Sequence, residues 1–226
     1  MDSMRKVYRG CIVCRMEILT ISNDHAADHA AATIRAGGVV LYPTDTLYGL
    51  GADALSDEAV AKLYAIKGRD EGKPIHAIVV DLAMAERFAN IDDTARTLAE
   101  QFLPGPLTLI LRKKEGINTG IAKGMDTFGI RIPDNSFCKD LVEHFGGPIT
   151  TTSANRAGMI PMRMLSQILE QLAEGADGIS LAIDAGELPK RMASTVVDCS
   201  GEHPVILREG AIAAADIWRA LDRDSE

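Results

Sequence analysis

The sequence predicts an α/β fold, a single domain in which a twisted mixed sheet is flanked by helices. Strand-like and helical patterns alternate from residue 18 to residue 221, and no repeat or Pro/Ser-rich linker divides the chain. Hydrophobic residues make up 46% of the 226 residues and aromatics only 4%, so the core is expected to consist of Ala, Val, Ile and Leu. We expect this domain over residues 17–226. Residues 1–16, an N-terminal extension without clear periodicity, are a candidate for disorder.

Capping and stop signals mark the elements of the first half. Asn23 or Asp24 can cap an Ala-rich helix that Gly37 and Gly38 stop. Ser56 can cap a second helix, which Gly68 ends. The elements expected next to these are strands at 39–42 and 75–80, the second helix at 57–67, and helical segments at 82–88 and 92–102.

Turn signals organise the second half in the same way. Pro104-Gly105-Pro106 and Gly146-Gly147-Pro148 each force a turn before an apolar run. The elements expected there are strands at 107–111, 128–132, 149–152, 179–183, 195–199 and 205–208, and helices at 136–145, 163–173 and 213–221.

Charge and composition exclude several classes of protein. The formal net charge of -8 argues against a general nucleic-acid coat protein, which needs a basic excess to displace phosphate counterions. No apolar run approaches the roughly 18 residues that span a bilayer, and no secretory signal is apparent, so we expect a cytoplasmic protein that does not enter a membrane. Cys11 and Cys14 form a C-x-x-C, half a zinc site or a redox pair. No second pair follows, which favours two reduced thiols without a function.

Several familiar binding motifs are incomplete or absent in this sequence. Gly49-Leu50-Gly51 begins like a dinucleotide fingerprint, but Ala54 stands at the third glycine position. Gly72-Lys73 is followed by a proline rather than Ser or Thr, so it is not a Walker A loop. The five histidines show no metal-ligand spacing, and no protein-ligated metal is expected.

Three segments remain as candidates for anion binding. Lys67-Gly68-Arg69, with Lys73 close behind, gathers cations at a helix end, although cations there also offset the helix dipole. Residues 150–155 offer hydroxyls and an amide at a strand end, where the alternative is a polar turn with a helix cap. Pro43-Thr44-Asp45-Thr46 follows another strand.

Two arginines lie in predicted strands. Arg131 must find a carboxylate, a ligand or solvent at its tip, and Arg208 closes the last strand. No Ser-His-Asp order, activated cysteine or close carboxylate pair is apparent. The pattern therefore favours catalysis by positioning and charge stabilisation, as in nucleotidyl or phosphoryl transfer.

Seven motifs occur in an order that resembles the YrdC/Sua5 family of L-threonylcarbamoyladenylate synthases. The resemblance covers about Asn23 to Gly210. The motifs are YPTDTLYGL at 42–50, KGR at 67–69, PGPLT at 104–108, GIRIP at 129–133, SAN at 153–155, STVVD at 194–198 and LREG at 207–210.

The resemblance implies a concave, locally positive cavity and the formation of threonylcarbamoyl-AMP and pyrophosphate from L-threonine, bicarbonate and ATP with Mg²⁺. The product would feed the t6A modification at tRNA position 37 through a downstream tRNA threonylcarbamoyl transferase, and weak tRNA or double-stranded RNA binding is left open. The catalytic residues it implies are Lys67, Arg69, Ser153 and Asn155. The ATP contacts it implies are Arg69, Lys73, Thr127, Ser153 and Arg208. The threonine contacts it implies are Thr46, Arg131, Thr151 and Ser194.

The sequence differs from the usual family pattern at two positions, and three other interpretations of its function are left open. Asp70 replaces the proline usual after the KGR arginine, and Ala157 stands where the family usually has a serine. The chain ends soon after residue 210, which resembles the short YrdC-type form without the C-terminal Sua5 domain. The rivals are a non-catalytic RNA-binding module, a carbamoyl-transfer enzyme related to hydrogenase maturation, and a paralogue with a different acceptor amino acid.

Overall fold

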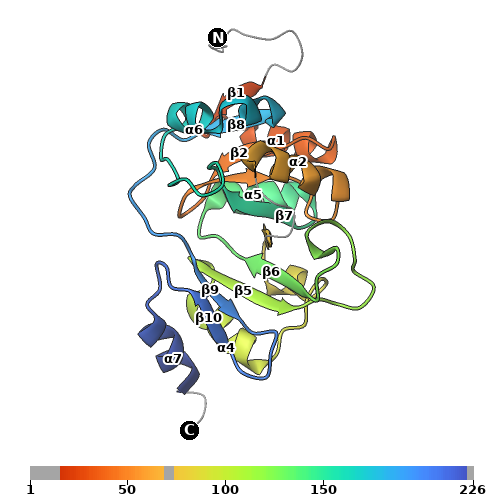
Figure 1. The fold of residues 1–226 in the computed structure, drawn as a ribbon, viewed down its shortest axis with the longest axis vertical. Coiled ribbons are helices and arrows are strands. Elements are labelled where there is room, and N and C mark those ends of the chain that lie inside the picture. Colours follow the sequence, from red (N-terminus) through yellow and green to blue (C-terminus); the bar gives the residue numbers. More distant parts are fainter. Residues whose placement is uncertain (1–15, 69–73, 223–226) are drawn as a thin grey trace.

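The computed structural model describes residues 16–68 and 74–222, and within them ten strands form one mixed sheet. The strand order is β1-β8-β2-β3-β7-β4-β6-β5-β9-β10, so the sheet runs the length of the molecule from β1 to β10 (Figure 1). The strands are β1 (Glu17–Thr20), β2 (Val40–Pro43), β3 (Tyr48–Gly51), β4 (His76–Ile78), β5 (Leu107–Arg112), β6 (Thr127–Arg131), β7 (Ile149–Ser153), β8 (Leu181–Asp184), β9 (Thr195–Asp198) and β10 (Val205–Arg208). This confirms the predicted α/β class with a mixed sheet.

Helices cover the two faces of the sheet unequally. The α-helices are α1 (Ala26–Arg35), α2 (Asp57–Lys67), α3 (Leu82–Ala85), α4 (Asp93–Phe102), α5 (Ser136–Phe145), α6 (Leu165–Leu172) and α7 (Ala214–Asp222), and the 3₁₀ helices are η1 (Gly120–Ala122) and η2 (Ala173–Gly178). Apolar residues of α2, α4, α6 and α7 belong to the larger core cluster. Those of α1 and α5 form a second cluster, whose strand residues come from β8, β2, β7 and β4. On that second face, β6 carries Thr127 and Arg131, whereas β5 and β9 carry polar residues (Thr108, Asp198) beside the buried apolar Ile110 and Val196.

Local signals account for most helix limits. The Ser56 side chain accepts a hydrogen bond from the N–H of Ala59 and caps α2, and Gly68 ends this helix in the left-handed region at φ 55°. The limits of α5 agree with the prediction. The predicted cap of α1 is wrong, because His25 occupies the N-cap without a side-chain bond. The Asn23 side chain instead accepts from the N–H of His25 in the preceding turn.

Two strands were not predicted, β1 and β3. β3 contains Gly49 and Gly51, and glycine is depleted in strands. A Cβ at Gly51 would lie 2.6 Å from the Tyr42 ring, so the close approach of β2 excludes a larger residue there. Packing against a neighbouring strand, which a single run of sequence does not encode, therefore overrides propensity at this position.

Candidate functional site

Strand alternation places the candidate residues on one face of the sheet. Residues paired across strands share a face, and Ile78 of β4 pairs with Arg131 of β6 and Ile149 of β7. Thr127 in β6, and Thr151 and Ser153 in β7, follow at even spacing on the same side. Ile78 and Ile149 pack in the cluster with α1 and α5. The polar residues therefore continue, along the sheet, the surface that those two helices cover.

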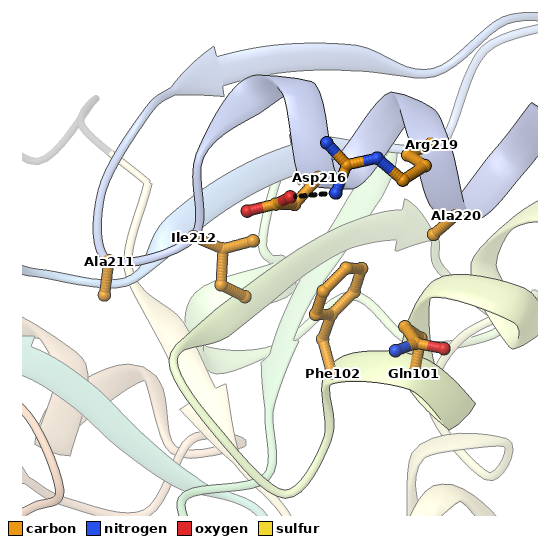
Figure 2. Close-up of a pocket in the computed structure, with 7 residues that line it drawn as sticks. All are labelled: Gln101, Phe102, Ala211, Ile212, Asp216, Arg219 and Ala220. Carbon is orange, nitrogen blue, oxygen red and sulfur yellow. Dashed lines mark hydrogen bonds and ion pairs between the residues drawn. The ribbon is translucent and has the colours of Figure 1, made fainter.

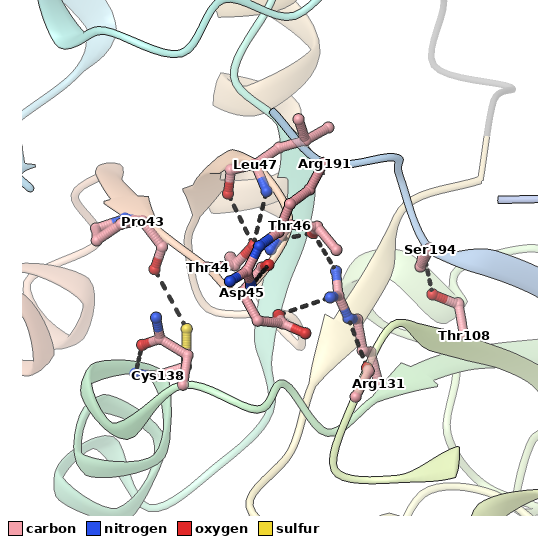
Figure 3. A network of polar contacts seen from close by, with 12 residues as sticks. Pro43, Thr44, Asp45, Thr46, Leu47, Thr108, Arg131, Cys138, Arg191 and Ser194 are labelled. Atoms are coloured by element: carbon pink, nitrogen blue, oxygen red, sulfur yellow. Dashed lines mark hydrogen bonds and ion pairs between the residues drawn. The ribbon is translucent and has the colours of Figure 1, made fainter. Parts of the chain in front are cut away.

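Arg131 is held at the end of β6 by three residues from two other parts of the chain, and two of these residues are labelled with it in Figure 3. Its Nη2 donates to Asp45 Oδ1 at 2.6 Å, its Nη1 to Thr46 Oγ1 at 2.8 Å, and its Nε to the carbonyl of Gly105 at 3.3 Å. The Arg131 side chain is 6% exposed and that of Asp45 5%. Of the partners that the sequence leaves open for Arg131, the structure provides a carboxylate, that of Asp45, a residue to which the sequence assigned no role of its own.

The turn between β2 and β3 supplies two of these partners, Asp45 and Thr46. The Thr44 hydroxyl donates to the carbonyl of Leu47 at 2.7 Å and accepts from the N–H groups of Thr46 and Leu47. Arg191, from the segment between β8 and β9, donates to the carbonyl of Asp45 at 2.6 Å. A cavity of about 340 Å³ borders this network. Its lining consists of Asp45, Thr46, Pro104, Gly105, Pro106, Asp134, Arg191, Met192 and Ala211.

Lys67 joins the end of α2 to the turn after β7. The side chain is buried, and its ammonium group donates to the carbonyl of Ser153, to the carbonyl of Asn155 at 2.9 Å and to Asn155 Oδ1 at 3.4 Å. The Ser153 hydroxyl donates to Asn155 Oδ1. The Ala157 N–H donates to the Lys67 carbonyl at 2.9 Å, a bond that the departure from serine leaves unchanged because it involves only backbone. Three members of the predicted tetrad therefore meet.

Ser194 and Arg208 form a third group. Arg208 donates to the Ser194 carbonyl from Nε at 3.2 Å and from Nη2 at 2.9 Å, and also to Ser194 Oγ at 3.2 Å. Ser194 Oγ lies 2.9 Å from Thr108 Oγ1. Burial, assisted by the nearby charge of Arg131, lowers the pKa of the Arg208 guanidinium. The positive charges of Arg131 and Arg208 therefore repel each other, and a bound anion would reduce that repulsion.

The remaining candidate residues do not belong to the three groups described above. Thr151 is half-buried in β7, beside the buried Tyr42 hydroxyl, whose pKa is raised by burial and lowered in part by Thr151. Thr127 lies at the far end of β6 from Arg131, about 13 Å away at 3.3 Å per residue. Arg69, Asp70, Lys73 and the C-x-x-C lie outside the described residues.

Three residues of the site were given no individual role by the sequence. Asp45 and Thr108 could have been found, since both belong to motifs that carry the family resemblance. Arg191 has no comparable signal, because its contact with Asp45 spans 146 residues of sequence.

Other features lie apart from these groups. A second cavity, of about 330 Å³, lies between α4 and α7 around Phe102 and Ile212, with an Asp216–Arg219 ion pair of 2.7 Å at its edge (Figure 2).

Cys138 and Cys199 are free and buried, and burial raises the pKa of the Cys199 thiol to about 12. Within residues 16–68 and 74–222, no three His, Cys, Asp or Glu side chains gather as a metal site would require. None of the helices in those ranges has the length and apolar character to cross a bilayer.

Known sequences resemble this chain over most of its length. The Sua5/YciO/YrdC family model, described as telomere recombination, matches residues 32–210. A relative from Methanocaldococcus jannaschii is 39% identical over 183 residues, which are 81% of this chain and 84% of the relative. The threonylcarbamoyl-AMP synthase of Bacillus subtilis is 36% identical over 87% of this chain, which spans only 56% of that protein.

Solved structures share the fold. The structure of Pyrococcus abyssi Sua5 complexed with L-threonine superposes with a TM-score of 0.82 at 32% identity, covering 92% of this chain and 61% of that one. E. coli YciO superposes with a TM-score of 0.77 at 25% identity, covering 90% of this chain and 98% of that one.

Proposed function

The chain belongs to the Sua5/YciO/YrdC family, and from this we propose that it is an L-threonylcarbamoyladenylate synthase. The enzyme would convert L-threonine, bicarbonate and ATP into threonylcarbamoyl-AMP and pyrophosphate. The observation that carries the proposal is the buried Arg131, which lies on the same sheet face as Ser153 of the Lys67 cluster. The names of several relatives, and the L-threonine complex of Pyrococcus abyssi Sua5, support the same assignment.

The amino-acid end of the site would be built around Arg131. A guanidinium has five N–H donors, and Asp45, Thr46 and Gly105 accept three of them. The two that remain, one on each terminal nitrogen, match the two oxygens of a carboxylate. Thr46, Thr151 and Ser194 would provide hydroxyls that fix the small substrate.

The nucleotide end would be built around Lys67, Ser153 and Asn155. Arg208 would join them, as would Arg69, Lys73 and Thr127 from the motif. Mg²⁺ would arrive with ATP, because phosphate oxygens are its preferred ligands. Donors preorganised by packing stabilise developing charge without reorganisation cost. The bonds that hold Lys67 to the Ser153–Asn155 turn would provide this preorganisation.

The chemistry would proceed in two steps. The threonine amine attacks bicarbonate to give a carbamate and water. A carbamate oxygen then attacks the α-phosphorus of ATP, the bond from that phosphorus to the bridging oxygen breaks, and pyrophosphate leaves. Holding the three reactants together supplies much of the acceleration, because reactive encounters become intramolecular. The cations offset the charge that develops on pyrophosphate.

The product would pass to a tRNA threonylcarbamoyl transferase for t6A formation at position 37. We also propose that the protein acts in the cytoplasm. Any direct tRNA binding would be weak, since the net charge of -8 opposes a polyanion and only local cations attract it.

An amino-acid panel tests the proposal. Pyrophosphate release from ATP is measured with each amino acid, with and without bicarbonate. We expect release only with L-threonine and bicarbonate together, and threonylcarbamoyl-AMP identified by mass spectrometry. A bicarbonate-dependent signal with another amino acid would favour a paralogue with a different acceptor. A flat panel, with tRNA retained in filter binding, would favour the RNA-binding module.

A further inference from the structure

Asp45 is a buried carboxylate to which the proposed chemistry gives no role. Its Oδ1 accepts from Arg131 Nη2 at 2.6 Å, and its side chain is 5% exposed. Its backbone carbonyl accepts from Arg191 at 2.6 Å, and the Thr44 hydroxyl closes the turn around it. The carboxylate is therefore held by contacts on both its side chain and its backbone, and it lines the cavity of about 340 Å³.

The three partners of Arg131 constrain its guanidinium plane. They come from the β2–β3 turn and from the Pro104–Pro106 turn, so the plane is held from more than one direction. Asp45 is the charged member of the set, and a charge-assisted bond is stronger than a neutral one. Removal of Asp45 would leave a buried guanidinium with only neutral acceptors among the described residues, an arrangement that favours rotation of the side chain.

We propose that Asp45 is a positioning residue for substrate binding, which orients Arg131 so that its two remaining N–H groups receive the carboxylate of the amino acid. The inference rests on the proposed function, because it takes an amino-acid carboxylate as the ligand of Arg131. Asp45 itself need not touch the substrate.

The negative charge of Asp45 could also act in the opposite sense. A carboxylate paired with Arg131 repels an incoming carboxylate and competes with it for the same donors. Positioning and competition make opposite predictions for Asp45→Asn, which keeps the shape of the side chain and removes the charge. Positioning requires weaker threonine binding in the variant, and competition requires tighter binding.

The experiment compares steady-state constants for the full chain. We expect Asp45→Asn to raise the threonine KM at least tenfold and to leave the ATP KM within twofold of the wild type. Calorimetric titration of L-threonine, in the presence of a non-hydrolysable ATP analogue, should show the same loss of affinity. If Asp45→Asn does not fold, Asp45→Glu is read by the same criterion, because its longer side chain displaces the guanidinium while keeping the charge.

Asp134→Asn is the matched control. Asp134 is exposed, lines the same cavity and makes no hydrogen bond or ion pair with Arg131. We expect its threonine KM to stay within twofold of the wild type.

Three outcomes would overturn the inference. They are an equal rise of the threonine KM in Asp134→Asn, an unchanged or lower threonine KM in Asp45→Asn, and equal rises of the threonine KM and the ATP KM in Asp45→Asn. A wild type that neither binds nor uses L-threonine would overturn the proposed function and this inference together, whereas an active wild type isolates the role of Asp45.

Discussion

The Lys67 ammonium is held by three oxygens of one turn, contributed by Ser153 and Asn155. Replacing Lys67 by alanine removes the donor and leaves buried acceptors unsatisfied, which costs about 1–3 kcal/mol of unfolding free energy. It also removes a cation from the proposed triphosphate site, where one such donor is worth about 10²–10³ in kcat. We expect Lys67→Ala to lose threonine-dependent pyrophosphate release and to melt at a lower temperature in calorimetry.

Lys62→Ala provides the comparison for that variant. Lys62 lies on the same helix, where it contacts Glu58 and the carbonyl of Gly37. Its loss should leave kcat within twofold of the wild type. Equal loss of activity in the two variants would remove Lys67 from the mechanism and point to a general weakening of α2.

Arg131→Lys tests the geometry of the acid-binding group. Lysine keeps the charge but has no planar fork, so it cannot satisfy Asp45, Thr46 and Gly105 and also bind a carboxylate through two donors. We expect the threonine KM to rise at least tenfold, with a smaller change in the ATP KM, in steady-state pyrophosphate assays. Arg96→Lys, at an exposed ion pair with Glu86, should leave both constants unchanged. An unaltered threonine KM would reject Arg131 as the carboxylate ligand.

At the scale of elements, α2 connects a capping serine at one end with Lys67 at the other. Ser56→Ala removes the bond to the N–H of Ala59 and should lower the unfolding free energy by about 1 kcal/mol. For a chain of this size that corresponds to a decrease of about 2–4 °C in Tm, measured by calorimetry. Ser166→Ala, at an exposed position within α6, should change Tm much less. A similar Tm decrease in both variants would show that the cap contributes nothing specific.

The sequence signals that worked best are local ones. Ser56, Gly68 and the residues around α5 reveal helix limits because each cap bonds to its own helix. β3 escaped prediction because its glycines follow from the packing of Tyr42 on the neighbouring strand. The motifs indicate which residues to propose for the site, but they do not indicate the partner of Arg131, because Asp45 lies 86 residues away along the chain. Only the strand order brings the two together.

At the scale of the whole molecule, the residues proposed for each ligand are spread over one sheet, and neither ligand has a part of the sheet to itself. Ser153 lies in β7, and Thr46 precedes β3, toward the end covered by α1 and α5. Arg131, Ser194 and Arg208 lie on or beside β6, β9 and β10, toward the other end. The net charge of -8 is compatible with this arrangement, because a few cations such as Arg131 and Arg208 act locally while the remaining surface sets the total.

A ligand that contacts both parts of the sheet should stabilise the molecule as one unit. At a concentration 100 times its Kd, such a ligand adds about 2.7 kcal/mol to the free energy of unfolding. At about 2–4 °C for each kcal/mol, Tm should rise by about 5–11 °C with either the ATP analogue or L-threonine alone at that concentration. We expect the combined shift to exceed the sum of the separate shifts, because the first ligand orders cations that the second also contacts.

D-threonine with the same nucleotide analogue is the control, since its inverted centre cannot present amine, carboxylate and hydroxyl to the same partners. An equal shift with the D-isomer would contradict an amino-acid site on this face, and strictly additive shifts would mean that the two ends bind their ligands independently.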